Sequence, residues 1–293
     1  MRLINHKAHR EQRKIKITSY FCHREKFSTM EVRAKKALGQ HFLTDLGVAR
    51  NIAESLTATG DVLEVGPGTG VLTQYLLERT DINLKMIEID KESVDYLLGH
   101  FPQADGRLIE GDFLRLKMED IFPGKFSVIG NFPYNISSQI FFKILEYKDS
   151  VPLVVCMIQK EVAERIAEKP GTKTYGILSV FLQAWYDIEY LFTVGEGAFN
   201  PPPKVKSSVI RLTRNSRTSL GCDEKLFRNI VKTAFGQRRK TMRNSLKPLI
   251  AAKAAWEGWN QEETAAFTSD PVFELRPERL GVEDFVALTL KLS

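Results

Sequence analysis

The stretch DVLEVGPGTGVLTQYLLERTDINLKMIEID, residues 61–90, decides the fold. It opens with an apolar run over 61–66, continues with apolar residues at helical spacing over 71–79, and closes with a second apolar run over 84–90. A strand, a helix and a second strand in this order predict a βαβ unit. Because the helix carries the chain back along the sheet, we expect the two strands to pair in parallel.

The same alternation continues toward the C-terminus, with a helical pattern at 91–101. Further short apolar or β-branched runs, each of strand length, follow it. They cover residues 107–112, 126–131, 152–159, 187–194 and 207–213. We expect the last two to form an antiparallel pair at one edge of the sheet. The pattern as a whole predicts a doubly wound α/β domain.

After about residue 214 the strand signal stops and only helical patterns remain. They lie at 223–235, 262–268 and 282–292. We therefore expect three parts in the chain: a basic N-terminal extension over 1–29, an α/β domain over 30–213 and a small all-helical domain over 214–293. The extension lacks apolar periodicity, and Met30 opens a run that reads as a natural start. We expect the extension to be either a disordered basic arm or a mis-assigned start.

The composition excludes several classes of protein. The chain has 293 residues, of which 43% are hydrophobic and 27% charged, as in an ordinary folded domain rather than a disordered or fibrous chain. Neither a membrane-spanning run of about 18 apolar residues nor a secretory signal is found, so we expect a cytoplasmic protein without a membrane partner. The three cysteines show no CxxC spacing, and we expect no metal site.

The positive charge is concentrated in two places. Residues 1–29 hold eight Lys or Arg and two Glu, which equals the whole net charge of +6. Residues 225–256 hold nine Lys or Arg and no acidic residue. Such a run can be a solvated helix face, but its bias favours a surface that contacts nucleic-acid phosphates.

A glycine-rich loop follows the first strand and contains Gly66 and Gly68, so that bare backbone approaches a ligand near a helix N-terminus. Dinucleotide enzymes and plain structural turns have similar loops. The second strand ends in Glu88, about 20 residues on, where an acid accepts hydrogen bonds from ribose hydroxyls. The third strand ends in Asp112, suited to an adenine amine, although both acids also fit polar strand ends. Because the loop is not GxGxxG and has no basic neighbour, we expect S-adenosylmethionine rather than NAD.

The fourth strand leads into Asn131, Phe132, Pro133 and Tyr134. The side-chain oxygen of Asn131 and the backbone carbonyl of Phe132 are two acceptors that would make an aromatic amine, such as adenine N6, more nucleophilic and align it. Pro133 fixes the backbone between them, and Tyr134 offers a face for a flipped base. The alternative is a proline-containing loop with a core tyrosine.

On these residues the chain resembles the rRNA adenine N6-dimethyltransferases, most closely the KsgA-type enzymes of the small ribosomal subunit. The similar segments, in the order of that family, are LGQHFL (38–43), EVGPGTG (64–70), IEID (87–90), GD (111–112), GNFPYNIS (130–137), QKEVAERI (159–166), YGILSV (175–180), AFNPPPKVKSSVIRL (198–212) and FGQRRKTMRNSL (235–246). The resemblance implies a Rossmann-like S-adenosylmethionine-dependent methyltransferase domain followed by a helical rRNA-binding domain.

The resemblance also implies roles for individual residues. The cofactor would be bound by His41, Leu43, Gly66, Gly68, Glu88, Asp112 and Asn131. Phe199 would close on the target adenine opposite Tyr134, or else be a hinge residue packed against the core. RNA would be bound by Arg238, Arg239, Lys240, Arg243 and Lys247. Two positions depart from the family, since Phe132 stands where Leu is frequent and His41 where Asn is common.

The implied function is dimethylation of N6 of two adjacent adenines near the 3′ end of small-subunit (16S) rRNA, with the assembling 30S subunit as partner and a monomer as the expected state. Two alternatives remain at this point. One is the related large-subunit methylase that confers macrolide resistance. The other is a binding protein, either an assembly checkpoint or a transcription-factor descendant, that keeps the fold without turnover.

Overall fold

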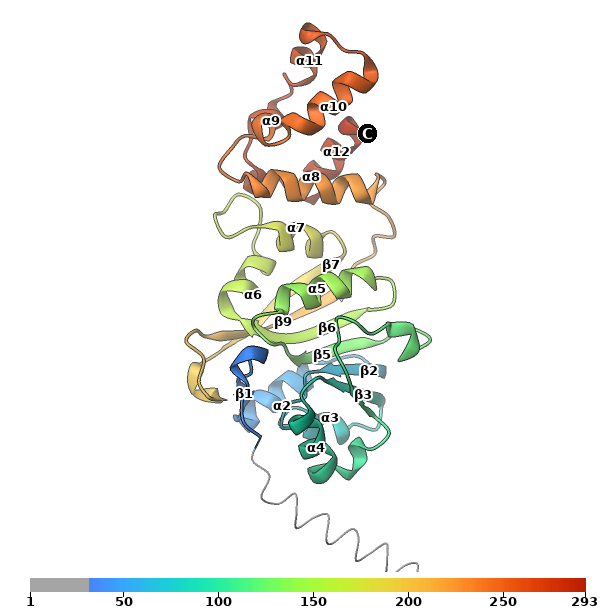
Figure 1. Ribbon diagram of the computed structural model, residues 1–293, viewed down its shortest axis with the longest axis vertical. Coiled ribbons are helices and arrows are strands. Elements are labelled where there is room, and N and C mark those ends of the chain that lie inside the picture. Colours follow the sequence, from blue (N-terminus) through green and yellow to red (C-terminus); the bar gives the residue numbers. More distant parts are fainter. Residues whose placement is uncertain (1–31) are drawn as a thin grey trace, which may run out of the picture.

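A computed structural model describes residues 32–293, so the expectation about residues 1–29 lies outside the described part of the chain. Its centre is a seven-stranded sheet with the order β4-β3-β2-β5-β6-β9-β7 (Figure 1). These strands are β2 (Gly60–Val65), β3 (Ile82–Glu88), β4 (Leu108–Glu110), β5 (Ser127–Asn131), β6 (Leu153–Gln159), β7 (Tyr186–Val194) and β9 (Ser207–Arg214). The strands β4, β3, β2, β5 and β6 run parallel to one another, as the βαβ pattern predicts.

The late antiparallel pair is confirmed, and it lies at one edge of the sheet as expected. Strand β9 lies between β6 and β7 and pairs antiparallel with both, so β7 alone forms the edge. The burial of β9 agrees with its inner place, since Val209 and Ile210, which point to opposite faces, are both completely buried. The sequence predicted the pairing of the two strands but not which of them faces β6.

Helices cover both faces of the sheet. They are α2 (Leu46–Ser55), α3 (Thr73–Leu77), α4 (Lys91–His100), α5 (Ser137–Glu146), α6 (Lys160–Ala167) and α7 (Ile177–Gln183). Successive strand residues point to opposite faces, so Val128 joins the cluster under α5 while Ile129 joins the cluster under α2 and α3. Asp45 and Asp90 begin α2 and α4, because their side chains accept hydrogen bonds from the backbone N–H groups of the first turn.

Only helices follow β9, namely α8 (Glu224–Gly236), α9 (Met242–Ser245), α10 (Lys247–Glu257), α11 (Gln261–Phe267), α12 (Val282–Leu292) and the short 3-10 helices at Pro271–Glu274 and Pro277–Arg279. They stack beyond α7 at the end of the molecule farthest from α4 (Figure 1). The α/β fold with a helical C-terminal segment is thus confirmed. That residues 214–293 act as a separate RNA-binding domain stays a prediction. No helix within residues 32–293 has the length and apolar content to span a membrane.

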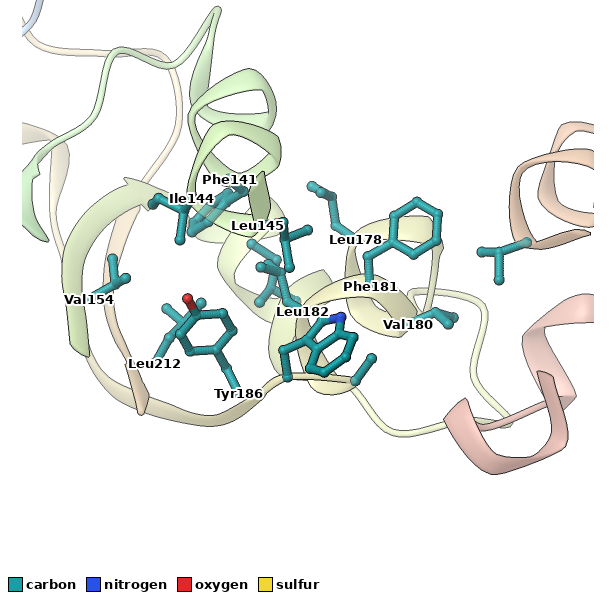
Figure 2. Packing of buried hydrophobic residues seen from close by; sticks show 14 of the residues in the cluster. Phe141, Ile144, Leu145, Val154, Leu178, Val180, Phe181, Leu182, Tyr186 and Leu212 are labelled. Atoms are coloured by element: carbon teal, nitrogen blue, oxygen red, sulfur yellow. The ribbon is translucent and has the colours of Figure 1, made fainter. Parts of the chain in front are cut away.

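One hydrophobic cluster runs from the sheet into these C-terminal helices. Figure 2 shows its middle part, where Phe141 of α5 lies near the strands and Phe181 of α7 lies on the side toward the C-terminal helices. The rings of Phe181 and Phe227 then lie 6.2 Å apart across the α7–α8 contact. Because the cluster is continuous across this contact, the C-terminal helices share the core of the α/β fold.

Candidate functional site

A cavity of about 280 Å³ opens at the carboxyl ends of β2, β3 and β5. The strand order reverses at β2, whose neighbours are β3 and β5, and ligands of open α/β sheets bind at such a switch point. Ten of the predicted site residues line this cavity. They are His41, Leu43, Gly66, Gly68, Glu88, Asp112, Asn131, Phe132, Pro133 and Tyr134. The structure therefore brings the two predicted halves, cofactor and target base, into one space.

The glycine loop after β2 needs its glycines for shape and for close approach. Gly66 and Gly68 have φ angles of 70° and 57°, in the left-handed region that residues with a Cβ seldom adopt. A Cβ on Gly68 would lie 3.0 Å from the ring of Phe42. Across the switch point, a Cβ on Gly130 would lie 2.4 Å from the carbonyl oxygen of Val65. Bare backbone at these positions lets the loop, Phe42 and β5 pack closely around the cavity.

Glu88 is buried at the end of β3, as the sequence predicts. Its carboxylate bonds to the glycine loop after β2 and to the turn after β3. Its Oε2 accepts a hydrogen bond from the N–H of Gly68 at 3.1 Å. Its Oε1 accepts from the N–H groups of Ile89 and Asp90, both at 2.9 Å. Burial raises the pKa of Glu88, and these three donors offset part of that rise. Oε2 retains room to accept a further hydrogen bond from a ligand.

Glu64, in β2, is a second buried carboxyl group that the sequence analysis did not select. It lines the cavity and is only 1% exposed, and its Oε2 has no hydrogen-bond partner within residues 32–293. Burial away from water, with the nearby charge of Glu88, raises the pKa of Glu64 to about 8. An acid inside an otherwise apolar strand was the available sequence signal.

Asp112 lies in the loop after β4, which ends at Glu110 rather than at Asp112 itself. Its Oδ1 accepts a hydrogen bond from the N–H of Leu114 at 2.9 Å, and its Oδ2 lies 3.3 Å from Nε of Arg115. Its place at the cavity wall agrees with the expected contact to an adenine amine. That contact stays a prediction.

The side chain of Asn131 is oriented by the segment that precedes α2. Its Nδ2 donates a hydrogen bond to the backbone carbonyl of His41 at 3.1 Å, so Oδ1 is the free acceptor of the amide. The next residue, Phe132, is completely buried against Phe141, while its backbone N–H bonds to the carbonyl of Met157 at 3.0 Å. Within residues 32–293, no loop or turn N–H donates to the carbonyl of Phe132. Two consecutive residues of the cavity lining thus each keep an acceptor oxygen to which no described loop or turn N–H donates.

Tyr134 is half-buried and its hydroxyl bonds to Ser207 Oγ. Burial, despite this hydrogen bond, raises the pKa of Tyr134, so the phenol stays neutral. The imidazole of His41 lies beside it, with ring centroids 5.3 Å apart at an angle of 30°. His41 Nδ1 lies 2.9 Å from the carbonyl oxygen of Pro201, and because a carbonyl only accepts, Nδ1 carries a proton.

Phe199 is the one predicted catalytic residue that the structure does not bring to the cavity. It lies in the short strand β8 (Phe199–Asn200), which pairs antiparallel with β1 (Phe42–Leu43). Its side chain is 4% exposed and packs in the cluster under α2 and α3, as the hinge alternative describes. A role opposite Tyr134 stays a prediction and requires the β8 segment to move.

The predicted RNA-binding side chains differ in how they are held. Arg238 donates to the carbonyl of Thr172 at 3.3 Å, and Arg243 donates to the carbonyl of Thr268 at 2.8 Å and pairs with Glu274. By contrast Arg239, Lys240 and Lys247 form no ion pair within the described residues. Only the second group is free to meet phosphates without breaking an ion pair of the fold.

The cavity suits a positively charged ligand without phosphate groups. Its described lining includes Glu64, Glu88 and Asp112 but no Lys or Arg. A pyrophosphate would meet the carboxylates of Glu88 and Asp112 and no cation of the lining, whereas the sulfonium and amino groups of S-adenosylmethionine would be stabilised. In the same described residues, no group of three or more His, Cys, Asp or Glu side chains is placed to hold a metal ion.

Comparisons with known proteins agree with this geometry. The family model described as "Ribosomal RNA adenine dimethylase" matches residues 31–263. The "Ribosomal RNA small subunit methyltransferase A" of Parabacteroides distasonis is 59% identical over 261 residues, which cover 88% of this chain and 94% of that protein. The protein of the same name from Porphyromonas gingivalis is 54% identical over 268 residues, covering 90% and 99% of the two chains.

Two solved structures resemble the whole fold. A dimethyladenosine transferase from Plasmodium falciparum superimposes with a TM-score of 0.68 and 25% identity, covering 86% of this chain and 96% of that one. The 23S rRNA methyltransferase ErmE gives a TM-score of 0.55 and 26% identity, covering 86% and 99%. The likeness to both extends beyond the sheet into the C-terminal helices, because 86% of the chain is covered.

Proposed function

Because the chain belongs to the ribosomal RNA adenine dimethylase family, we propose that it transfers methyl groups from S-adenosylmethionine to N6 of two adjacent adenines near the 3′ end of small-subunit rRNA. The observation that carries this proposal is the acidic cavity in which Glu88 and the two acceptors at Asn131 and Phe132 meet. We also propose that the enzyme works in the cytoplasm as a monomer on the assembling 30S subunit, in line with the sequence expectations.

S-adenosylmethionine, when bound, supplies a methyl group on a positively charged sulfur. The chain's part in binding is to hold that cation among acids, with Glu88 Oε2 free to accept from a ribose hydroxyl and Asp112 at the adenine wall. The peptide loop at Gly66 and Gly68 then lies directly against the ligand.

At the target base, two acceptors do the chemical work. Oδ1 of Asn131 and the carbonyl of Phe132 would accept the two hydrogens of adenine N6, which draws its lone pair out of the ring and points it at the methyl group. The face of Tyr134 would support the flipped base at about 1 to 3 kcal/mol per stacked base. No side chain has to ionise, and water takes the proton that N6 loses.

Two methyl groups on each of two bases require four transfers. After the first transfer N6 has one hydrogen left, so only one of the two acceptors can still be used. The second transfer must therefore rely more on stacking and shape than on hydrogen bonds. The cofactor must also be exchanged between rounds.

The test is incubation of under-methylated small subunits with labelled cofactor, followed by mass mapping of the rRNA. Dimethylation of two neighbouring adenines near the 3′ end is expected. Methyl groups on large-subunit rRNA would instead favour an activity like that named for ErmE. The chain is 59% identical to the small-subunit enzyme of Parabacteroides distasonis and 26% identical to ErmE, which supports the first outcome. Tight subunit binding without any transfer would favour the binding-protein alternative.

A further inference from the structure

Residues 35–43 form one wall of the cavity, and we call this segment the strap. Its residues Ala37 to Leu43 all line the cavity, and Phe42 packs on the backbone of Gly68. A ligand held in the cavity is therefore enclosed between the strap and the strand ends. Anything that holds the strap down also keeps the ligand in.

The strap is attached at two ends. The end nearer α2 is held by backbone pairing of β1 with β8 and by the hydrogen bond from Asn131 to the carbonyl of His41. The other end is held by side chains, through Lys35 and Gln40. Lys35 also fixes Gln40, because its backbone N–H donates to Gln40 Oε1 at 2.7 Å.

Both side chains converge on Asp90, at the start of α4. Lys35 Nζ lies 2.5 Å from Oδ1 of Asp90, and Gln40 Nε2 donates to Oδ2 at 3.2 Å. Asp90 is only 3% exposed. Burial alone would raise its pKa, but these donors outweigh burial and lower it, so the carboxylate is ionised at neutral pH. The buried carboxylate is thus held by two donors of the strap, one of which is charged.

Asp90 also contacts a residue of the cavity lining. Its backbone N–H donates to Oε1 of Glu88, the acid expected to bind the ribose. A single residue therefore connects the strap to the carboxylate that would hold the ligand. The same turn therefore carries both the hydrogen bond to Glu88 and the attachment of the strap.

We propose that Lys35, Gln40 and Asp90 form a clasp that holds the strap over bound S-adenosylmethionine and sets how long the cofactor stays in the site. Lys35 and Asp90 are positioning residues, since neither lines the cavity, and Gln40 acts with them through its bond to Asp90. The inference rests on the proposed function for the identity of the ligand. Because four transfers require cofactor exchange, the clasp must open between rounds. Lys35 has a second partner in Glu92, whose Oε1 lies 3.2 Å from Nζ, and can keep this contact when it leaves Asp90.

The experiment uses the full chain and measures cofactor binding directly, without RNA. Lys35→Met removes the charge of a partly exposed side chain, and Asp90→Asn keeps the helix cap while removing the buried charge. Each is expected to raise the cofactor dissociation rate and Kd about tenfold, which corresponds to the loss of one strong charged interaction. Turnover at saturating cofactor should change less than threefold. The double variant should be no worse than the single variants, because both remove the same interaction.

Two controls make the result decisive. Lys35→Arg keeps the positive charge and should release the cofactor at nearly the wild-type rate. Lys91→Met removes a Lys from an exposed ion pair with Asp95 on α4 and should not change cofactor release. Hydrogen exchange in residues 35–43 should rise in Lys35→Met. If Lys35→Met folds normally but releases cofactor at the wild-type rate, the clasp does not exist. If the wild-type chain does not bind the cofactor at all, the proposed function fails instead.

Discussion

The side-chain amide of Asn131 donates to the backbone carbonyl of His41, with 3.1 Å between nitrogen and oxygen. This bond decides which atom of the Asn131 amide is available to a ligand. Its Nδ2 is already bonded to His41, and its Oδ1 is left as an acceptor. The acceptor role of Asn131 therefore depends on the strap as well as on β5.

Replacing Asn131 by Ala is expected to lower the rate of methyl transfer by about 100-fold or more, since one aligned acceptor at the reacting nitrogen is lost. Cofactor affinity should fall much less. Single-turnover methylation with labelled cofactor measures the first quantity and calorimetry the second. Asn83→Ala removes a comparable amide on the far end of β3, where it bonds to Asp61, and serves as the control. A near-normal transfer rate in Asn131→Ala would rule out the acceptor role.

Glu88→Gln should weaken cofactor binding by about 10- to 100-fold, because an amide cannot accept all three loop N–H groups and still accept from a ribose. The neighbouring Glu110 offers a matched control. It pairs with Glu88 in the β3–β4 register but is exposed and not part of the cavity lining. Glu110→Gln is therefore expected to bind normally, and equal effects of the two changes would contradict the role given to Glu88.

The buried carboxyl of Glu64 predicts an unusual dependence of stability on pH. Its folded pKa of about 8 lies above its unfolded value, so its contribution to stability is complete below pH 4.5 and is lost as pH rises toward 8. The loss amounts to about 1 kcal/mol per pH unit within that window. Urea unfolding of wild type and Glu64→Gln between pH 5.5 and 7.5 measures it. The variant should gain stability relative to wild type as pH rises, and a constant difference would contradict the raised pKa.

The basic surface should separate into two kinds of residue. Changing Arg239, Lys240 and Lys247 to Ala is expected to weaken subunit binding and to reduce its salt slope by about one for each phosphate that is no longer bound. Unfolding should be unaffected, since these side chains have no ion pairs in the described structure. Arg243→Ala should instead lower stability by about 1 kcal/mol, because it unpairs the Thr268 carbonyl. Lys125→Ala, exposed in the loop before β5, is the control for unspecific charge loss.

The sequence was sufficient where a local pattern determines the outcome. The apolar runs predict each strand of the sheet, and parallel pairing then forces the residues after β2, β3 and β5 to one edge, which places Glu88 and Asn131 together. It was insufficient where distant segments meet. The burial of Phe199 depends on pairing of β8 with β1, and the clasp joins Lys35 to Asp90 across 55 positions of sequence. Neither contact produces a periodic pattern in the sequence from which it could be predicted.

The charge count could not separate free cations from paired ones for a related reason, and its prediction of a nucleic-acid surface stays a prediction. It treated nine basic residues between 225 and 256 as equivalent, although Arg238, Arg243 and Lys253 have partners within the fold. A tally of charges cannot tell a side chain that binds its own chain from one that is free. That distinction required the positions of Thr172, Thr268 and Glu257.

The continuous hydrophobic core between α7 and α8 holds the C-terminal helices in a fixed position relative to the sheet. With Phe181 and Phe227 packed in one cluster across the two parts, the span from the exposed cations of the C-terminal helices to the acceptors at Asn131 is set by the fold. Under the proposed function, a nucleotide would then be chosen by its distance from the phosphates that those cations would bind, rather than by the identity of its neighbours. With that span fixed, the proposed methylation of two neighbouring adenines would require the RNA to move relative to the enzyme.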